Sequence, residues 1–240
     1  RWRWWRPVRN RRRRAGRRRR LRSGRRRPAD GRREEKQVYI EQVRVVPQPF
    51  GSLFNLMLND LGKPASQRFL TQKIGIVDVG FRTADFTISD RSRYSERGSV
   101  STDAGISSAY TQVATWLQEK SGITVELFRL YEAVARGSIK IKGKSYDIGP
   151  VVQQAFQQLA QRIASDANRL WSDDWDIDAI VITGGGGQVL APMLAPQLEG
   201  EVLPVPADTD IRLANVTGYH KYGVHLWGDG NSASASGTAG

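Results

Sequence analysis

Two acidic residues flank a glycine turn in the stretch GIVDVGFRTADFTISD, residues 75–90. Asp78 ends an apolar run, and a carboxylate in that position is unfavourable unless it is solvated, paired or bound to a metal. Gly80 lets a backbone lie close to a ligand, and the amides of residues 80–83 can together hold an anion. An acid beside such amides suits a magnesium-bound phosphate, since the acid can hold the metal's water shell while the amides hold phosphate oxygens.

The same turn carries further polar groups. Arg82 adds a cation and Thr83 a hydroxyl, whereas Asp85, at the start of the next alternating segment, is expected to be structural. A plain hairpin with a satisfied Asp78 explains the pattern equally well, because the spacing D-x-G-x-x-T is weak evidence by itself.

A second candidate motif is IVITGGGG, residues 180–187, in which an apolar strand runs into four consecutive glycines before a short helix. Glycines at the start of a helix allow close approach of a flat or phosphorylated ligand. A flexible loop is the alternative reading, so this motif is also only suggestive when taken alone.

Hydrophobic periodicity and helix-stop residues assign the elements that would position both motifs. Strands are predicted at residues 38–46, 73–80, 84–89, 94–100, 177–183 and 201–205. Helices are predicted at residues 50–61, 103–120, 125–136, 150–171, 187–195 and 210–226, the second capped by Asp103, and a hairpin is predicted to turn at Lys142-Gly143. Successive strands followed by helix, strand and helix indicate an α/β domain with a mixed sheet, whose ligands gather at strand ends.

Charge divides the 240 residues unevenly. Residues 1–33 contain 18 Arg and one acid, a net +17, so the net +13 of the whole chain leaves −4 for the remainder. The absence of Cys excludes disulfides, Cys-based zinc sites and thiol chemistry. No apolar run approaches the roughly 20 residues of a membrane helix, and a cytoplasmic location without membrane contact is expected.

The Arg-rich segment has three open readings. It could be a disordered arm that binds nucleic acid through its charge and Trp residues. It could lie on an anionic membrane surface. It could also be non-native sequence, since Arg and Trp have GC-rich codons and Lys is absent before Lys36.

Taken together, the motifs resemble the C-terminal half of the actin-like ATPases, closest to the bacterial plasmid-segregation branch of the ParM/StbA type within the actin, chaperone and sugar-kinase superfamily. DVGFRTADF resembles that superfamily's second phosphate motif, IVITGGGGQVLAPML its adenosine motif, VVPQPFG the segment connecting the two halves, and IRLANVTGYHKYG the closing helix. GSVSTDAGI and the helix-hairpin-helix pattern after it match an inserted subdomain. The resemblance covers roughly residues 36–227. It implies a ribonuclease-H-like, actin-type α/β ATPase domain, the second half of that fold, with an inserted helical and hairpin subdomain.

The resemblance also implies a role for each matched position. Gln48 would orient the attacking water, and Asp78 would bind Mg²⁺ through water. The residues implied to bind ATP, or GTP, are Gly80, Arg82, Thr83, Glu132, Gly184, Gly185 and Gly186.

The implied organisation has three parts: residues 1–35 as the Arg-rich segment, 36–228 as the second actin-like domain with its inserted subdomain at about 99–170, and 229–240 as a flexible tail. The first half of an actin-like ATPase carries its own phosphate motif, and no such motif precedes residue 36. We therefore expect a truncated chain with half a nucleotide site and little or no hydrolysis alone, because catalysis needs charge stabilisation from both sides.

The function implied for the full-length form is a filament-forming ATPase that segregates plasmid DNA, with its own protomers and a DNA-bound adaptor protein as partners. A chaperone-type ATPase or a sugar kinase is disfavoured, because neither a substrate-binding domain nor a sugar pocket is evident in the sequence. The remaining alternative is a non-enzymatic actin-like module tethered to nucleic acid by the Arg-rich segment, which predicts salt-sensitive DNA binding that removal of residues 1–33 abolishes.

Overall fold

The structure is a computed structural model that describes residues 42–204 and 210–228. The described residues from Pro47 onward belong to one compact unit. The Arg-rich segment, the C-terminal tail and residues 38–41 of the strand predicted at 38–46 lie outside the described residues. The other residues of that predicted strand, 42–46, have no regular secondary structure. None of the described helices combines the length and the apolar character that crossing a membrane requires.

A four-stranded mixed sheet forms the centre of this unit, in the order β3-β2-β1-β6. Its strands are β1 (Lys73–Val79), β2 (Ala84–Asp90), β3 (Arg93–Thr102) and β6 (Ala179–Thr183). β1 pairs with β2 in antiparallel and with β6 in parallel orientation. The mixed sheet predicted from the sequence is therefore confirmed, and both candidate motifs lie at the same end of adjacent strands.

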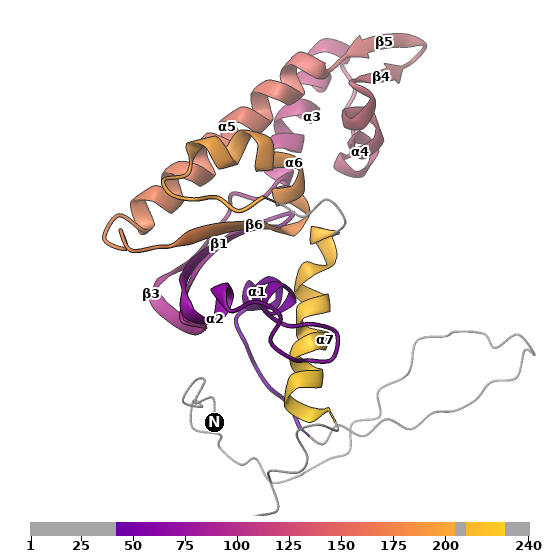
Figure 1. The fold of residues 1–240 in the computed structure, drawn as a ribbon. Coiled ribbons are helices and arrows are strands. Elements are labelled where there is room, and N and C mark those ends of the chain that lie inside the picture. Colours follow the sequence, from indigo (N-terminus) through magenta and orange to yellow (C-terminus); the bar gives the residue numbers. More distant parts are fainter. Residues whose placement is uncertain (1–41, 205–209, 229–240) are drawn as a thin grey trace, which may run out of the picture. The chain divides into compact units, whose positions relative to one another are not determined.

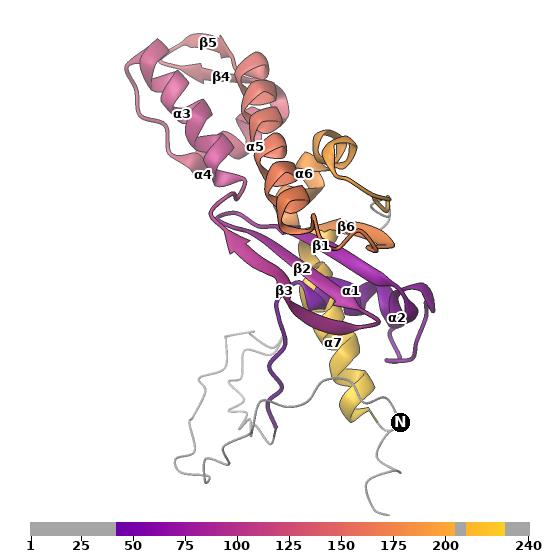
Figure 2. The same cartoon turned by 90° about the vertical axis from the view of Figure 1, so that its left-hand side faces the viewer.

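Helices cover both faces of the sheet (Figures 1 and 2). Helices α5 (Gly149–Leu170) and α6 (Gly184–Leu194) lie on one face, and α1 (Phe50–Met57), α2 (Arg68–Thr71) and α7 (Ala214–Trp227) lie on the other. Side chains of a strand alternate between its two faces. Val77 and Val79 of β1 pack into the hydrophobic core beneath α5 and α6, so the residue between them faces α1 and α7.

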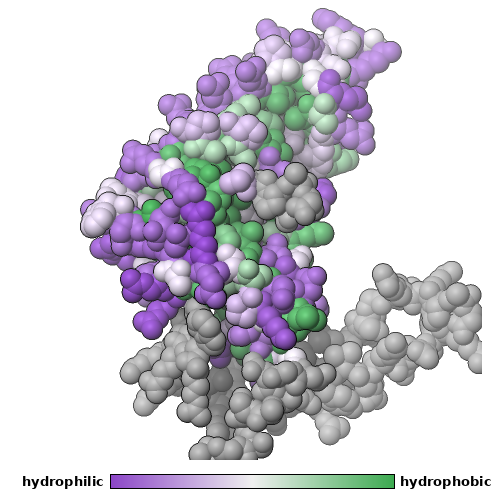
Figure 3. All heavy atoms as spheres, viewed as in Figure 1, coloured by the Kyte–Doolittle hydropathy of each residue, from purple (hydrophilic) through white to green (hydrophobic). Residues whose placement is uncertain are grey.

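Between β3 and α5 the chain forms α3 (Ser107–Ser121), α4 (Leu127–Arg136) and a hairpin of β4 (Ser138–Ile141) and β5 (Lys144–Asp147). The hairpin turns at Lys142-Gly143, as predicted, with both residues at positive φ, 47° and 84°. Helix α3 packs against α5, and one continuous cluster of buried residues joins these helices to the sheet. Hydrophilic residues follow the outer edge along α5 in Figure 3, whereas hydrophobic residues lie mostly in the middle of that face.

Five further predicted elements or boundaries are wrong. Helix α1 ends at Met57 rather than at residue 61, because Leu58 forms an isolated β-bridge with Pro64. Of the strand predicted at 201–205, the described residues 201–204 contribute only a bridge between Val202 and Ile180, and residue 205 lies outside the described residues. The last helix begins at Ala214 rather than at residue 210, because a short 3-10 helix, Ile211–Leu213, precedes it. A second 3-10 helix, Ala195–Gln197, follows α6.

The other two corrections concern helix starts. Asp103 does not cap α3; its carboxylate pairs with Arg162 instead. The helix begins only at Ser107, because the amides of Gly105 and Ile106 donate to carbonyls of the turn after β1. Helix α6 begins at Gly184 rather than at residue 187, so the glycines themselves form its first turn.

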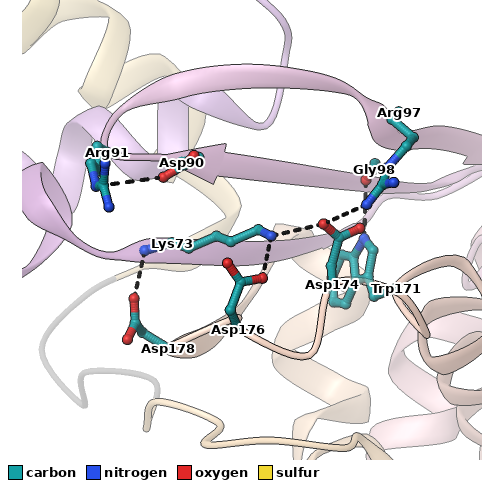
Figure 4. A network of polar contacts seen from close by, with 9 residues as sticks. All are labelled: Lys73, Asp90, Arg91, Arg97, Gly98, Trp171, Asp174, Asp176 and Asp178. Carbon is teal, nitrogen blue, oxygen red and sulfur yellow. Dashed lines mark hydrogen bonds and ion pairs between the residues drawn. The ribbon is translucent and has the colours of Figure 1, made fainter.

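A polar network fixes the end of β1 that lies opposite Asp78 (Figure 4). The ammonium of Lys73 lies 2.8 Å from Asp174 and 2.5 Å from Asp176, and its backbone amide donates to Asp178 at 2.8 Å. Arg97 of β3 reaches Asp174 at 3.1 Å. The start of β1, the middle of β3 and the loop before β6 are thereby held together.

Candidate functional site

Asp78 lies near the C-terminal end of β1 and is only 2% exposed. In the sheet register it stands between Asp85 of β2 and Thr183 of β6. Its side chain faces α1 and α7, since its neighbours on the strand fill the opposite core. A carboxylate is therefore buried at the strand end, as the sequence pattern suggested.

A chain of hydrogen bonds leads from this carboxylate across the face. Asn215 of α7 donates from Nδ2 to Asp78 Oδ2 at 2.7 Å. Ser52 of α1 donates to Asn215 Oδ1 from its amide at 2.8 Å and from its hydroxyl at 2.9 Å. Thr183 Oγ1 lies 2.7 Å from Ser52 Oγ. Because the single hydroxyl hydrogen of Ser52 is given to Asn215, Thr183 is the donor in that pair.

The environment of Asp78 raises the pKa of its carboxyl above the ordinary 3.8. Burial is the largest cause, because it disfavours the charged form, and the nearby charge of Asp85 acts in the same direction. Hydrogen bonds with Asn215 and Gln48 lower the pKa but do not cancel the effect of burial. A cation near Asp78 would favour the carboxylate, so the site suits a positively charged group.

Gln48 and Asp78, the two residues predicted to act in catalysis, lie close together, since the Gln48 side chain is near enough to lower the pKa of the Asp78 carboxyl. The backbone of Gln48 is held in place by two hydrogen bonds to its carbonyl. Its carbonyl accepts from the amide of Gly51 at 3.0 Å and from the hydroxyl of Tyr219 at 2.8 Å. The connecting segment therefore presents Gln48 at the end of β1.

Glycines allow α1 and α7 to cross closely enough to make these bonds. A Cβ on Gly218 would overlap the carbonyl oxygen of Gly51, and one on Gly51 would lie 2.5 Å from the carbonyl oxygen of Asn215. Real Cβ atoms do not approach other atoms so closely, so both positions require glycine. This crossing places Ser52 and Asn215 side by side.

The turn after β1 only partly matches its predicted role as an anion cradle. The amide of Gly80 donates to the carbonyl of Thr83 at 2.8 Å, so it is not available to a ligand, contrary to the sequence-based expectation. Phe81, Arg82 and Thr83 are exposed, and their amides have no backbone acceptor among the described residues. The Thr83 hydroxyl donates to Asp85 at 3.1 Å. The available anion donors are thus the three later amides.

The glycines of the two motifs differ in what surrounds them. A Cβ on Gly184 would fall on Asp78 Oδ1 and on the carbonyl of Val79, and the φ of Gly184 is +83°. A Cβ on Gly186 would lie 2.8 Å from the Val79 side chain. Neighbouring protein atoms therefore leave no room for a side chain at these two positions. The two glycines allow α6 to pack closely against β1.

Gly80 and Gly185 have more room. The nearest atom to a Cβ on Gly80 is the Thr83 carbonyl oxygen at 3.4 Å, and the nearest to one on Gly185 is Cγ of Arg212 at 3.5 Å. The protein itself does not require glycine at either position. Space beside these two residues is therefore open to a ligand.

Glu132 lies apart from the Asp78 network. It is exposed on α4 and pairs with Arg136 one turn later at 3.3 Å. The preceding residue, Tyr131, packs edge-on against Phe81 with ring centroids 6.4 Å apart. Helix α4 therefore approaches the turn after β1 through Tyr131, whereas the side chain of Glu132 pairs with Arg136 of its own helix.

The side chains around Asp78 decide which metal ion the site could hold. Within residues 42–204 and 210–228, no three His, Cys, Asp or Glu side chains cluster as metal ligands. One carboxylate beside the amide side chain of Gln48 fits a hydrated ion such as Mg²⁺, which usually keeps several of its waters. The residues present do not form an all-protein cage.

Sequence reasoning missed Ser52, Thr183, Asn215 and Tyr219, which hold Asp78 and Gln48 in place. The available signal was weak: a polar residue on the inward side of an otherwise apolar helix or strand, such as Asn215 in IRLANV. Only the pairing of distant elements shows that these side chains meet.

Comparisons with known proteins agree with this fold. Residues 76–196 match the family described as the archaeal actin homologue MreB-like, C-terminal. The structure of a pCBH ParM non-polymerisable quadruple mutant is similar with a TM-score of 0.66 and 25% identity, covering 78% of this chain and 57% of that one. No match was found among curated proteins.

Two further solved structures share the fold. A 15-stranded ParM filament from Clostridium botulinum matches with a TM-score of 0.64 and 24% identity, covering 78% of this chain and 55% of that one. An archaeal actin homologue in complex with ADP matches with a TM-score of 0.62 and 19% identity, covering 73% and 55%.

The chain thus spans little more than half the length of the solved structures that it matches. The matched residues 76–196 contain the buried Asp78, the turn after it and the glycine-started helix α6. The fold is the actin-type α/β fold, and the chain belongs to the family of archaeal MreB-like actin homologues, of which it contains the C-terminal domain.

Proposed function

We propose that this chain is the second-domain half of an actin-like, filament-forming ATPase and that it binds Mg²⁺ with ATP or GTP at the end of β1. The observation that carries the proposal is Asp78, a buried carboxylate with a raised pKa beside a turn with exposed amides. A structure similar to this chain was determined in complex with ADP, which supports the choice of a nucleotide.

Each residue would have a defined task. The Asp78 carboxylate would accept hydrogen bonds from metal-bound water, and its burial would strengthen that contact. The amides of residues 81–83, with the Arg82 cation and the Thr83 hydroxyl, would hold phosphate oxygens. Bound Mg²⁺ would neutralise charge on the phosphates. Gln48, fixed by Tyr219 and Gly51, would orient a water for in-line attack.

The nucleoside would lie against the first turn of α6. Gly185 faces open space there, while Gly184 and Gly186 hold the helix close to β1. Glu132 would contribute only through an approach of α4, which already contacts the turn through Tyr131. Phosphoryl transfer needs charge stabilisation from both sides of the phosphates, so we expect hydrolysis to require a second half-site.

Titration of the full chain with a fluorescent ATP analogue in Mg²⁺ tests the nucleotide site. We expect Gly80→Val to weaken binding by about tenfold or more while the melting temperature stays close to wild type, because an added Cβ meets the Thr83 carbonyl oxygen only at the ordinary contact distance of 3.4 Å. Asp78→Asn should remove the dependence of binding on Mg²⁺. Asp90→Asn, an exposed acid at the other end of β2, is the matched control.

Wild-type binding that neither Gly80→Val nor Asp78→Asn alters would place the nucleotide elsewhere. An absence of any saturable binding by the wild-type chain would contradict the nucleotide proposal itself. Asp90→Asn must behave like wild type for the comparison to count.

Self-association into filaments, plasmid DNA segregation, an adaptor protein as partner and a cytoplasmic location are the finer parts of this proposal. Solved ParM structures that resemble this chain include a filament, which supports self-association as the mode of action. Exposed apolar residues Leu213 (54%) and Val216 (59%), at the start of the closing helix, offer a surface for another domain or protomer.

Sedimentation with and without Mg-ATP, on the full-length protein, tests the filament proposal. We expect a pellet that depends on nucleotide and is lost with Asp78→Asn. A protein that stays in the supernatant with every nucleotide would speak against a filament-forming function.

A further inference from the structure

A cavity of about 320 Å³ lies on the α1, α2 and α7 side of the sheet, beside the strand that leads to the proposed nucleotide site. Its walls come from α1, α2, β6 and the segments around the start of α7. The lining residues are Ser52, Asn55, Leu56, Arg68, Phe69, Val181, Ile182, Thr183, Leu203, Pro204, Ile211 and Ala214. This volume is at the small end of the range for ligand sites.

The lining is mostly apolar, which favours an apolar ligand. The one cation, Arg68, is already engaged: it donates to Glu201 at 2.6 Å and to Gln72 at 2.6 Å. An anionic ligand would have to displace Glu201 from Arg68. The cavity therefore suits a neutral molecule.

The polar end of the cavity has a defined hydrogen-bonding capacity. Thr183 and Ser52 are each 2% exposed and line the cavity. The Thr183 hydroxyl hydrogen is used toward Ser52, whose own hydrogen is used toward Asn215. Thr183 Oγ1 keeps a lone pair that can accept, so a ligand group reaching it must be a donor.

From these features we propose that the cavity binds a small neutral aromatic molecule that carries one hydrogen-bond donor, of the phenol or naphthol class. The aromatic rings lie among Leu56, Phe69 and Val181, and the donor reaches Thr183 Oγ1. A ring of this kind gains from apolar burial, and the single donor can satisfy the open lone pair of Thr183 Oγ1.

Such a ligand would act on the proposed nucleotide site through a continuous chain of contacts. Thr183, Ser52, Asn215 and Asp78 are joined by hydrogen bonds of 2.7 to 2.9 Å. A ligand group that donates to Thr183 Oγ1 polarises this chain of hydrogen bonds. It thereby changes the strength of the hydrogen bond that Asn215 donates to the Asp78 carboxylate. This coupling rests on the proposed nucleotide function, whereas the binding of the aromatic molecule does not.

The test uses 2-naphthol, whose fluorescence reports binding, and naphthalene, which lacks the hydroxyl. The full chain should bind 2-naphthol saturably and about five- to tenfold more tightly than naphthalene, the worth of one hydrogen bond. Leu56→Trp fills the cavity from α1 and should abolish binding of both probes. Leu61→Trp introduces the same side chain at a position 71% exposed and should leave binding unchanged.

A second pair of variants addresses the donor. Thr183→Val replaces the hydroxyl by a methyl group of similar size and should remove the preference for 2-naphthol over naphthalene without abolishing naphthalene binding. Thr87→Val is the matched control, since Thr87 is a buried threonine of the same sheet, 3% exposed, that does not line the cavity. Circular dichroism of each variant verifies that the fold is intact.

The outcomes separate the two proposals. No saturable 2-naphthol binding, or binding that Leu56→Trp and Thr183→Val both leave unchanged, overturns the cavity proposal whatever the nucleotide result. Naphthol binding in a chain that binds no nucleotide supports the cavity and contradicts the proposed function. If both ligands bind, saturating 2-naphthol should change the nucleotide affinity severalfold in wild type and not in Thr183→Val; equal affinity with and without it overturns the coupling.

Discussion

At Asp78, burial and hydrogen bonding act in opposite directions on one carboxyl group. Burial raises its pKa, and the bonds from Asn215 and Gln48 only reduce that rise. A group whose pKa is raised by folding binds a proton more readily in the folded than in the unfolded state. Its contribution to stability therefore falls as pH rises from 3.8 through the folded-state pKa. A buried carboxyl that lowers the stability of the folded protein at neutral pH is typical of a functional site.

Asp78→Asn should accordingly make the ligand-free protein at least as stable as wild type at pH 7, and the wild-type loss of stability with rising pH should disappear. The asparagine carbonyl can still accept from Asn215, so the network is kept. Thermal unfolding followed from pH 4 to 8 measures the difference. A variant that is clearly less stable than wild type at pH 7 would show that Asp78 serves stability instead.

At the scale of elements, the crossing of α1 and α7 positions the site. Glycines at 51 and 218 bring the two helices into backbone contact, and the bonds of Ser52 and Asn215 depend on that approach. An added methyl at the contact must push the helices apart or distort them, because packed interiors leave no room to absorb it.

Gly218→Ala should therefore destabilise the protein by about 1–3 kcal/mol and weaken nucleotide binding by displacing Asn215. Gly223→Ala lies on the same helix, where a Cβ meets only Trp227 at 3.9 Å. It should stabilise the helix by up to about 1 kcal/mol through propensity.

Urea unfolding of both variants, alongside the ATP-analogue titration, checks the contrast. Equal stability changes for the two alanines would mean that the crossing is not a close-packed contact.

At the scale of the whole molecule, the Lys73 network joins segments far apart in the sequence (Figure 4). Burial would raise the pKa of Asp174, but hydrogen bonds from Lys73 and Arg97 hold it below 3.8. Burial would likewise lower the pKa of Lys73, yet its bonds to Asp174 and Asp176 keep it above 10.5. A carboxyl with a lowered pKa contributes stability that is present above 3.8 and lost as pH falls through the folded-state value.

Asp174→Asn should lower the free energy of unfolding at pH 7 by about 1–2 kcal/mol, a modest loss because Asp176 still pairs with Lys73. The difference from wild type should shrink as pH falls below 3.8 through the lowered pKa of the folded wild-type carboxyl. Asp173→Asn, an exposed neighbour in the same loop, is the control. Denaturant unfolding at pH 3 and pH 7 measures both; a difference that does not depend on pH would argue against the ion pair.

Local pattern was enough to predict most of the elements. Alternation located β1, β2 and β3, glycine with its left-handed freedom located the turn at Lys142-Gly143, and apolar spacing located α5. The boundaries that failed are those that other parts of the chain decide. Helix α3 starts late because the turn after β1 holds Gly105 and Ile106, and α6 starts early because its glycines pack on Val79.

The sequence by itself located the two motifs, because these depend on short-range spacing along the chain. The resemblance of those motifs to the actin-like ATPases then implied the actin-type fold and made Gln48 and Asp78 the candidate catalytic residues. The tertiary structure alone decided what holds the site: Asn215 bonds to Asp78 across 137 residues of sequence, and Ser52 bonds to Thr183 across 131. The same packing leaves a cavity beside that network. Hydrogen bonds between distant elements leave no periodic trace, since each depends on how closely two helices cross and not on the residues next to it.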